Sequence, residues 1–121
     1  MSKRILVVED QEDNRRIVRD LLTSVGYEII EAVTGEEGVT LAETQHPDLI
    51  LMDIQLPVID GYEAARRIKV NQALCHIPII AVTSYALSGD DVKAFASGCD
   101  DYVAKPYSPR ALLAKIRQYV P

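Results

Sequence analysis

The sequence Leu49-Ile50-Leu51-Met52-Asp53 places four consecutive apolar residues directly before a carboxylate. An apolar run without alternation is typical of a strand that is covered on both faces, as in a parallel sheet. Similar runs occur at residues 5–8, 78–82 and 102–104, whereas residues 28–32 are more polar, which favours an edge strand. The sequence therefore predicts five short strands.

Stretches of helical periodicity separate these strands. The first carries one apolar stripe that Gly26 ends, made up of Ile17, Val18, Leu21, Leu22 and Val25. Further helices are predicted from Gly35, after an N-cap at Asp60, over residues 88–97 and from Pro109. The side chains of these helices that we expect to face inward are Val39, Ala42, Ala64, Ala65, Ile68, Leu112, Ile116 and Val120.

The order of these elements determines the expected fold class. Strands that alternate with helices pair in parallel through right-handed crossovers, which gives an α/β, doubly wound sheet with helices on both faces. We expect a flavodoxin-like, five-stranded parallel sheet of strand order 2-1-3-4-5, although periodicity alone does not choose this order from the alternatives. Residues 1–121 contain no linker, repeat or low-complexity segment, so we predict one domain.

Composition excludes several classes of function. The 121 residues carry a formal net charge of −5, which argues against a general nucleic-acid or anionic-membrane surface. The first apolar run is too short for a signal peptide or a membrane span, so we expect a cytoplasmic protein. Cys75 and Cys99 have no Cys-x-x-Cys spacing, and we expect both to be buried apolar side chains.

Polar and charged side chains follow the predicted strands. Glu9 and Asp10 follow the first strand, Asp53 the third, Thr83 the fourth and Lys105 the fifth. In an open parallel sheet, ligands bind beyond the carboxyl ends of the strands. Taken singly, each residue has a structural explanation as a helix cap, a turn residue or a solvated lysine. Their placement at one edge of the sheet favours a functional site instead.

Electrostatics indicates what such a site does. Two carboxylates about 5 Å apart repel by about 3 kcal/mol at an effective dielectric near 20, so three of them need a cation or a proton. An all-oxygen site suits Mg²⁺ better than zinc, and His46 and His76 lie at the opposite ends of their strands. Beside Mg²⁺, Asp53 can act as a nucleophile toward phosphorus and form an acyl phosphate. Lys105 and Thr83 would then contact the phosphoryl oxygens.

Four motifs carry a resemblance to a known family. They are Val7-Val8-Glu9-Asp10, Leu51-Met52-Asp53-Ile54-Gln55-Leu56-Pro57 leading to Asp60-Gly61, Ala81-Val82-Thr83-Ser84, and Tyr102-Val103-Ala104-Lys105-Pro106. Together they resemble the response-regulator receiver family of the CheY-like superfamily, over the whole chain and in the right order. The resemblance implies that Asp53 is the phosphoacceptor of a two-component system.

The resemblance also implies the metal ligands. Mg²⁺ would be held at the acidic pair Glu9 and Asp10, by Asp53 and by the backbone carbonyl of Gln55. The chain would then be a phosphoacceptor rather than an enzyme, although it assists its own Mg²⁺-dependent phosphorylation and dephosphorylation.

The resemblance implies a switch as well as a reaction. Thr83 and Lys105 would contact the phosphoryl group, and the Thr83 hydroxyl would be coupled to rotation of Tyr102. The donor would be a histidine kinase or a histidine phosphotransfer protein. Because the chain stops at Pro121, we expect output through protein contacts of a monomer or weak dimer. We place that contact face on the fourth helix, fifth strand and fifth helix, where outward-facing candidates are Tyr85, Lys93, Tyr102, Tyr107, Arg110 and Leu113.

Several alternatives stay open at this point. Tyr107 and Leu113 are equally compatible with the core. Within the family, the chain is similar to free-standing chemotaxis and polar-differentiation (DivK-type) regulators, and residues 77–86 favour the latter or the receiver of a hybrid histidine kinase. A phosphorylation-independent pseudo-receiver is a further alternative. A dehalogenase-type phosphatase is disfavoured because Gln55 stands where a second catalytic acid belongs, and a flavodoxin-like carrier because Glu9 and Asp10 would repel a phosphate.

Overall fold

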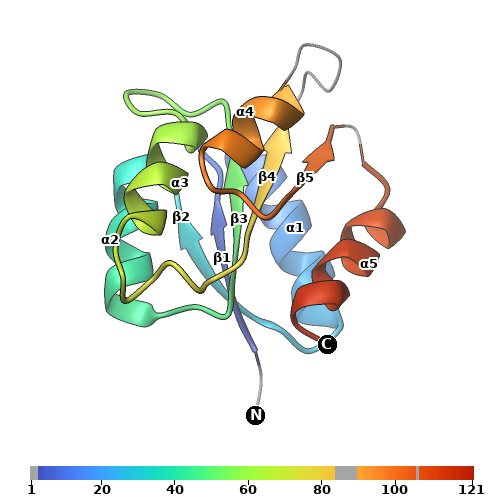
Figure 1. Cartoon of the computed structure of the whole chain (residues 1–121). Coiled ribbons are helices and arrows are strands. Elements are labelled where there is room, and N and C mark those ends of the chain that lie inside the picture. Colours follow the sequence, from blue (N-terminus) through green and yellow to red (C-terminus); the bar gives the residue numbers. More distant parts are fainter. Residues whose placement is uncertain (1–2, 84–89, 106) are drawn as a thin grey trace.

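Five strands alternate with five helices in the computed structural model, which describes residues 3–83, 90–105 and 107–121 (Figure 1). The strands are β1 (Arg4–Val8), β2 (Glu28–Ala32), β3 (Leu49–Asp53), β4 (Ile79–Thr83) and β5 (Asp101–Ala104). The helices are α1 (Glu12–Ser24), α2 (Gly35–Gln45), α3 (Gly61–Lys69), α4 (Asp90–Ala96) and α5 (Pro109–Tyr119).

The sheet has the predicted topology. All four pairings are parallel, and the strand order is β2-β1-β3-β4-β5. Strands β3 and β4 are buried throughout, whereas β2 lies at one edge and is mostly half-buried. The expected doubly wound α/β fold is therefore confirmed, and β2 is an edge strand as its polarity indicated.

Successive side chains of the central strands point to opposite faces of the sheet and pack into two hydrophobic cores, one on each face. Helices α2, α3 and α4 cover one face, and α1 and α5 cover the other (Figure 1). All the side chains of α2, α3 and α5 that we expected to face inward are buried or, for Val39, half-buried. The predicted N-cap is also confirmed, because the Asp60 side chain accepts a hydrogen bond from the backbone N–H of Glu63 over 2.9 Å.

The apolar stripe of α1 is narrower than the sequence suggested. Val18 and Leu22, one turn apart, occupy the core, whereas Ile17 and Val25 are 61% and 39% exposed. A helix that lies on one face of a sheet buries only the positions directly above that face, so the flanks of a wide stripe stay in solvent. Thr83, which was expected to follow the fourth strand, is the last residue of β4. The predicted start of the fourth helix lies outside the described residues.

The expectation that both cysteines are buried is wrong for Cys75. Cys75 is exposed in the segment between α3 and β4, whereas Cys99 is buried before β5. Burial raises the pKa of the Cys99 thiol to about 12. The two thiols are therefore expected to differ strongly in reactivity, because only the thiolate is nucleophilic.

A disulfide reagent at pH 8 should accordingly modify one thiol of the native chain quickly and the second only after unfolding. The reaction can be followed by absorbance, and Cys75→Ser should remove the fast phase. Equal rates for both thiols in the native chain would contradict the burial of Cys99.

Among the described residues, no helix combines the length and the apolar character needed to cross a membrane.

Candidate functional site

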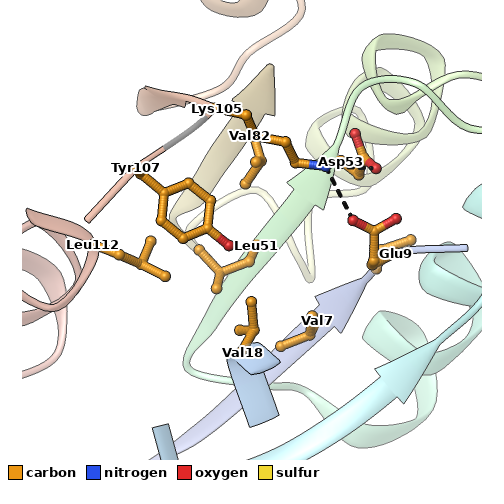
Figure 2. Close-up of a pocket in the computed structure, with 10 residues that line it drawn as sticks. Val7, Glu9, Val18, Leu51, Asp53, Val82, Lys105, Tyr107 and Leu112 are labelled. Atoms are coloured by element: carbon orange, nitrogen blue, oxygen red, sulfur yellow. Dashed lines mark hydrogen bonds and ion pairs between the residues drawn. The ribbon is translucent and has the colours of Figure 1, made fainter. Parts of the chain in front are cut away.

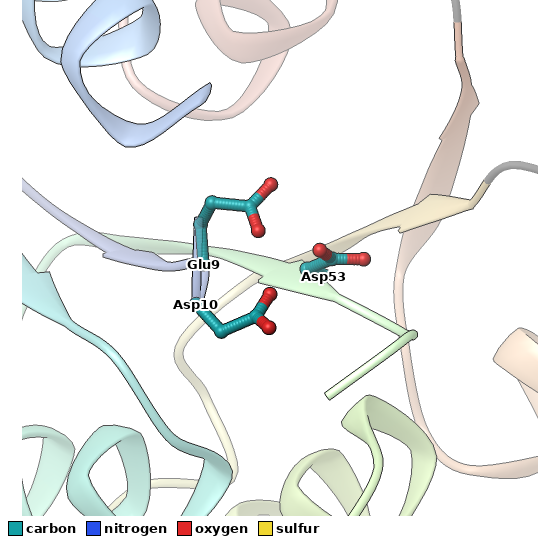
Figure 3. Close-up of side chains that lie close together, drawn as sticks. All are labelled: Glu9, Asp10 and Asp53. Carbon is teal, nitrogen blue, oxygen red and sulfur yellow. The ribbon is translucent and has the colours of Figure 1, made fainter. Parts of the chain in front are cut away.

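Three carboxylates gather where β1 and β3 end. Oxygen atoms of Glu9, Asp10 and Asp53 all lie within 4.8 Å of one another. Figure 3 shows the carboxylates of Glu9 and Asp10 reaching from the end of β1 toward the end of β3, where Asp53 lies. Glu9 and Asp53 are buried, whereas Asp10 is exposed. The sequence-based expectation that these residues converge on one edge of the sheet is met.

Lys105 supplies the positive charge of the site. Its Nζ lies 3.1 Å from Glu9 Oε1 and 3.5 Å from Asp53 Oδ2, so that it joins the two buried carboxylates (Figure 2). Its backbone N–H donates to the carbonyl of Thr83 over 2.6 Å, which ties the end of β5 to the end of β4. Burial acts to lower the pKa of the Lys105 ammonium, but the charges of Asp53 and Glu9 outweigh burial and raise it. Lys105 therefore carries its charge at neutral pH.

Backbone amides hold the two buried carboxylates in place. The N–H of Gln55 donates to Asp53 Oδ1 over 3.1 Å, and the N–H of Gln11 donates to Glu9 Oε2 over 3.2 Å. Together with Lys105, these contacts leave little freedom to either carboxylate. The Gln55 side chain itself is exposed.

Asp10 behaves differently from its two neighbours. Asp10 is exposed as a whole, but some loss of solvent around its carboxyl, a hydrogen bond with Glu9 and the Glu9 charge, in that order, raise its pKa, and a backbone hydrogen bond and the Lys105 charge offset only part of this. An upward shift means that the charged form of Asp10 is disfavoured next to the other acids. A cation placed among the three carboxylates would remove this cost.

Thr83 and Tyr102 occupy neighbouring strands near the acidic cluster. Thr83 is buried at the last position of β4, one residue beyond the sheet partner of Asp53. Tyr102 is half-buried on β5 and packs on the core beneath α2, α3 and α4, with its ring edge-on to Phe95 at 6.0 Å. Tyr102 therefore lies outside the acidic cluster.

A pocket beside the carboxylates contains a residue that sequence reasoning did not assign to the site. Tyr107 lines this pocket together with Glu9, Asp53 and Lys105, above an apolar floor (Figure 2). Burial raises the pKa of the Tyr107 phenol. The position of Tyr107 two residues after Lys105 could have indicated that it lies near the site. The helical pattern of the sequence did not decide whether its side chain is buried in the core or exposed on the surface.

The predicted output residues are divided by the structure. Lys93 and Arg110 are exposed, and Tyr102 is half-buried. Tyr107 and Leu113 are half-buried and pack against the core that lies under α1 and α5. Each side chain therefore contacts the core with one part and solvent with another. Tyr85 lies outside the described residues.

The donor set matches one class of ion. Three carboxylates against one ammonium leave a local excess of negative charge, which attracts a divalent cation. The donors are all oxygen atoms, as a hard cation such as Mg²⁺ requires, and neither sulfur nor imidazole belongs to the cluster that the described residues form. The acidic cluster is therefore compatible with Mg²⁺.

Comparison with known proteins gives a consistent result. Residues 5–117 match the family model of the response regulator receiver domain. The polar-differentiation response regulators DivK of Brucella ovis and Brucella suis are 43% identical over 120 residues, which cover 99% of this chain and 98% of theirs.

Solved structures agree with this match. The receiver domain of a sensor histidine kinase of Pseudomonas aeruginosa PAO1, determined with a magnesium ion coordinated in its active-site cleft, is 38% identical with a TM-score of 0.92 and covers 98% of both chains. The chemotaxis response regulator CheY4 of Vibrio cholerae is 25% identical with a TM-score of 0.93, over 99% of this chain and 100% of its own.

Proposed function

The chain belongs to the response regulator receiver family of two-component signalling, and on this premise we propose that Asp53 accepts a phosphoryl group in a Mg²⁺-dependent reaction. Receiver domains are phosphoacceptor signalling proteins rather than classical enzymes. The observation that carries the proposal is the buried Asp53 carboxylate, which lies within 4.8 Å of two further carboxylates and 3.5 Å from the Lys105 ammonium.

Mg²⁺ would be held at the acidic edge of the sheet. Asp10, Asp53 and the backbone carbonyl of Gln55 are the proposed ligands, with Glu9 completing the acidic pair. When bound, the ion supplies positive charge for the three carboxylates and the incoming phosphoryl oxygens. Glu9 is already engaged by Lys105 and by the Gln11 amide, so its contribution is chiefly to hold Lys105 beside Asp53.

The side chains around Asp53 favour nucleophilic attack. An Asp53 oxygen attacks the phosphorus of a phosphohistidine, the new O–P bond forms, and the N–P bond breaks to release the imidazole of the donor. Lys105, whose Nζ lies 3.5 Å from Asp53 Oδ2, is proposed to contact the phosphoryl oxygens, and the Thr83 hydroxyl is proposed to donate to them.

The proposed partners follow from this chemistry. A histidine kinase or a histidine phosphotransfer protein would be the donor, and a downstream protein would bind the face formed by α4, β5 and α5. Residues 1–121 would act as one receiver domain. The match to DivK supports a regulator of the polar-differentiation type, whereas the likeness to the Pseudomonas domain supports the alternative of a hybrid-kinase receiver.

Phosphorylation is expected to shift an existing equilibrium between two conformations of the α4–β5–α5 face. In the phosphorylated conformation, Thr83 moves toward the phosphoryl group and Tyr102 turns into the space that Thr83 leaves. Beryllofluoride with Mg²⁺ imitates the phosphoryl group and allows amide NMR shifts to be compared in the two states. We expect changes both around Asp53 and on this face. Changes confined to the surroundings of Asp53 would rule out the switch and leave the phosphoacceptor role intact.

Mg²⁺ affinity is expected to depend on pH because protons compete for the Asp10 carboxylate. The pKa of Asp10 is raised, so its protonation begins at a higher pH than that of an isolated aspartate. The affinity for Mg²⁺ should therefore fall as the pH is lowered through the pKa of Asp10. Calorimetric titrations between neutral and mildly acidic pH measure this dependence. Asp10→Asn should bind Mg²⁺ more weakly and with a flatter pH profile, and an unchanged profile would exclude Asp10 as the competing group.

A further inference from the structure

A second cation contacts the acidic site from the side of α1. Arg15 donates from Nη1 to the backbone carbonyl of Glu9 over 3.0 Å and from Nε to Glu31 Oε1 over 3.2 Å. Its side chain is only 15% exposed, although an arginine on the surface of a helix normally reaches into solvent. Arg15 therefore joins three elements, namely α1, the end of β1 and the edge strand β2.

We propose that Arg15 is a positioning residue for the metal site, whose two contacts together fix the peptide unit between Glu9 and Asp10. The inference rests on the proposed Mg²⁺ site and names a residue on which its affinity depends.

The backbone of Glu9 is held from two directions. Its N–H donates to the carbonyl of Ala32 at the end of β2 over 3.0 Å, and its carbonyl accepts from Arg15. The Glu9 carbonyl and the Asp10 N–H belong to one rigid, planar peptide unit. Fixing that carbonyl therefore fixes the plane from which Asp10 projects.

Asp10 is the carboxylate that needs this constraint. Glu9 and Asp53 are buried, and Lys105 contacts both of their carboxylates, whereas Asp10 is exposed on the loop after β1. Repulsion from the other two acids favours rotation of Asp10 away from the cluster. A peptide unit held by Arg15 fixes the backbone from which the Asp10 side chain projects, so fewer backbone rotations can carry the carboxylate away from the cluster.

Glu31 makes this constraint compatible with cation binding. An unpaired guanidinium beside the site would repel Mg²⁺, but Glu31, which Arg15 shares with Arg19, accepts from Arg15 and offsets part of this charge. The rigid guanidinium fork reaches both acceptors at once, which a lysine ammonium on a flexible stem does less well.

Arg19 provides a matched control on the same helix. It also pairs with Glu31, over 3.2 Å between Nη1 and Oε2, and its side chain is 41% exposed. Among the described contacts, Arg19 binds Glu31 and Asp20 and does not reach the Glu9 carbonyl. Removing Arg19 thus perturbs Glu31 and the surface of α1 while the Arg15–Glu9 contact remains.

The test measures Mg²⁺ dissociation constants by calorimetry for the wild-type chain, Arg15→Met, Arg15→Lys and Arg19→Met. Groups that orient metal ligands typically contribute about 10–100-fold to affinity, so Arg15→Met should weaken binding about tenfold or more. Arg15→Lys keeps the charge but loses the two-point contact, and should weaken binding by at least about threefold. Arg19→Met should stay within about twofold of wild type, since an exposed pair contributes little.

Urea unfolding without Mg²⁺ separates a loss of stability from a loss of affinity. Wild-type affinity in Arg15→Met or in Arg15→Lys, or equal losses in Arg15→Met and Arg19→Met, would overturn the inference. If Arg15→Met does not fold, the comparison of Arg15→Lys with wild type decides the question. A wild-type chain that binds no Mg²⁺ would overturn the proposed metal site together with this inference, whereas the other outcomes concern Arg15 alone.

Discussion

Asp53→Asn is expected to abolish Mg²⁺-dependent phosphorylation and to leave the fold intact. The amide has the shape of the carboxylate but is a poor nucleophile, so no acyl phosphate can form at this position. The substitution removes one of three mutually repelling charges and also one partner of Lys105. These two effects oppose each other, so the free energy of unfolding should stay within about 1 kcal/mol of the wild-type value.

Labelling with acetyl phosphate and Mg²⁺, followed by intact-protein mass spectrometry, measures this effect. Asp13→Asn is a suitable control, because Asp13 lies on α1 and forms only an exposed ion pair with Arg16 in the described structure. It should be labelled like the wild type. Stable labelling of Asp53→Asn at the wild-type level would exclude Asp53 as the acceptor.

Gly61→Ala should destabilise the fold by roughly 2–4 kcal/mol, because the loop after β3 packs directly on the backbone of the acceptor strand. A Cβ at Gly61 would overlap the carbonyl oxygen of Asp53 and come within 2.7 Å of the Ile54 Cα. Both are backbone atoms, which cannot move aside as a flexible side chain can. The Gly61 N–H also donates to the Ile54 carbonyl over 3.0 Å, so relief of the overlap would break this contact.

Urea unfolding of Gly61→Ala and of a control measures this cost. Gly26→Ala is the control, since Gly26 adopts φ +97° and a Cβ there meets nothing within 4 Å. It should lose only about 1–2 kcal/mol from backbone strain. Alanine has the higher helix propensity, so without the overlap Gly61→Ala would not be destabilised. A Gly61→Ala chain as stable as the wild type would therefore show that Gly61 does not pack against the Asp53 backbone as described.

The sheet could be predicted from sequence because its central strands are apolar on both faces. In runs such as residues 49–52, apolar and polar residues do not alternate, which indicates a strand covered on both faces. The charged residues of β2 predicted its place at the edge of the sheet. The convergence of Glu9, Asp10 and Asp53 followed from the same topology, since the carboxyl ends of parallel strands meet at one edge. These predictions depend on the backbone, and the structure agrees with them.

Predictions that depend on the reach and rotation of single side chains were less successful. Ile17 was placed on the buried stripe of α1, but it is exposed because the helix buries only the positions directly above the sheet. Cys75 was expected to be buried, but it is exposed in the segment between α3 and β4, which is neither helix nor strand. The contact of Arg15 with the Glu9 carbonyl joins residues on two elements, and no sequence spacing encodes it.

The central claim is that a Mg²⁺-dependent acyl phosphate forms on Asp53. The direct measurement treats the chain with acetyl phosphate and Mg²⁺, reduces it with borohydride, which converts an aspartyl phosphate to homoserine, and maps the product by peptide mass spectrometry. We expect homoserine at position 53 when Mg²⁺ is present and an unmodified aspartate when Mg²⁺ is chelated. Homoserine at another position, or an unmodified Asp53 in a folded, Mg²⁺-loaded chain, would contradict the claim.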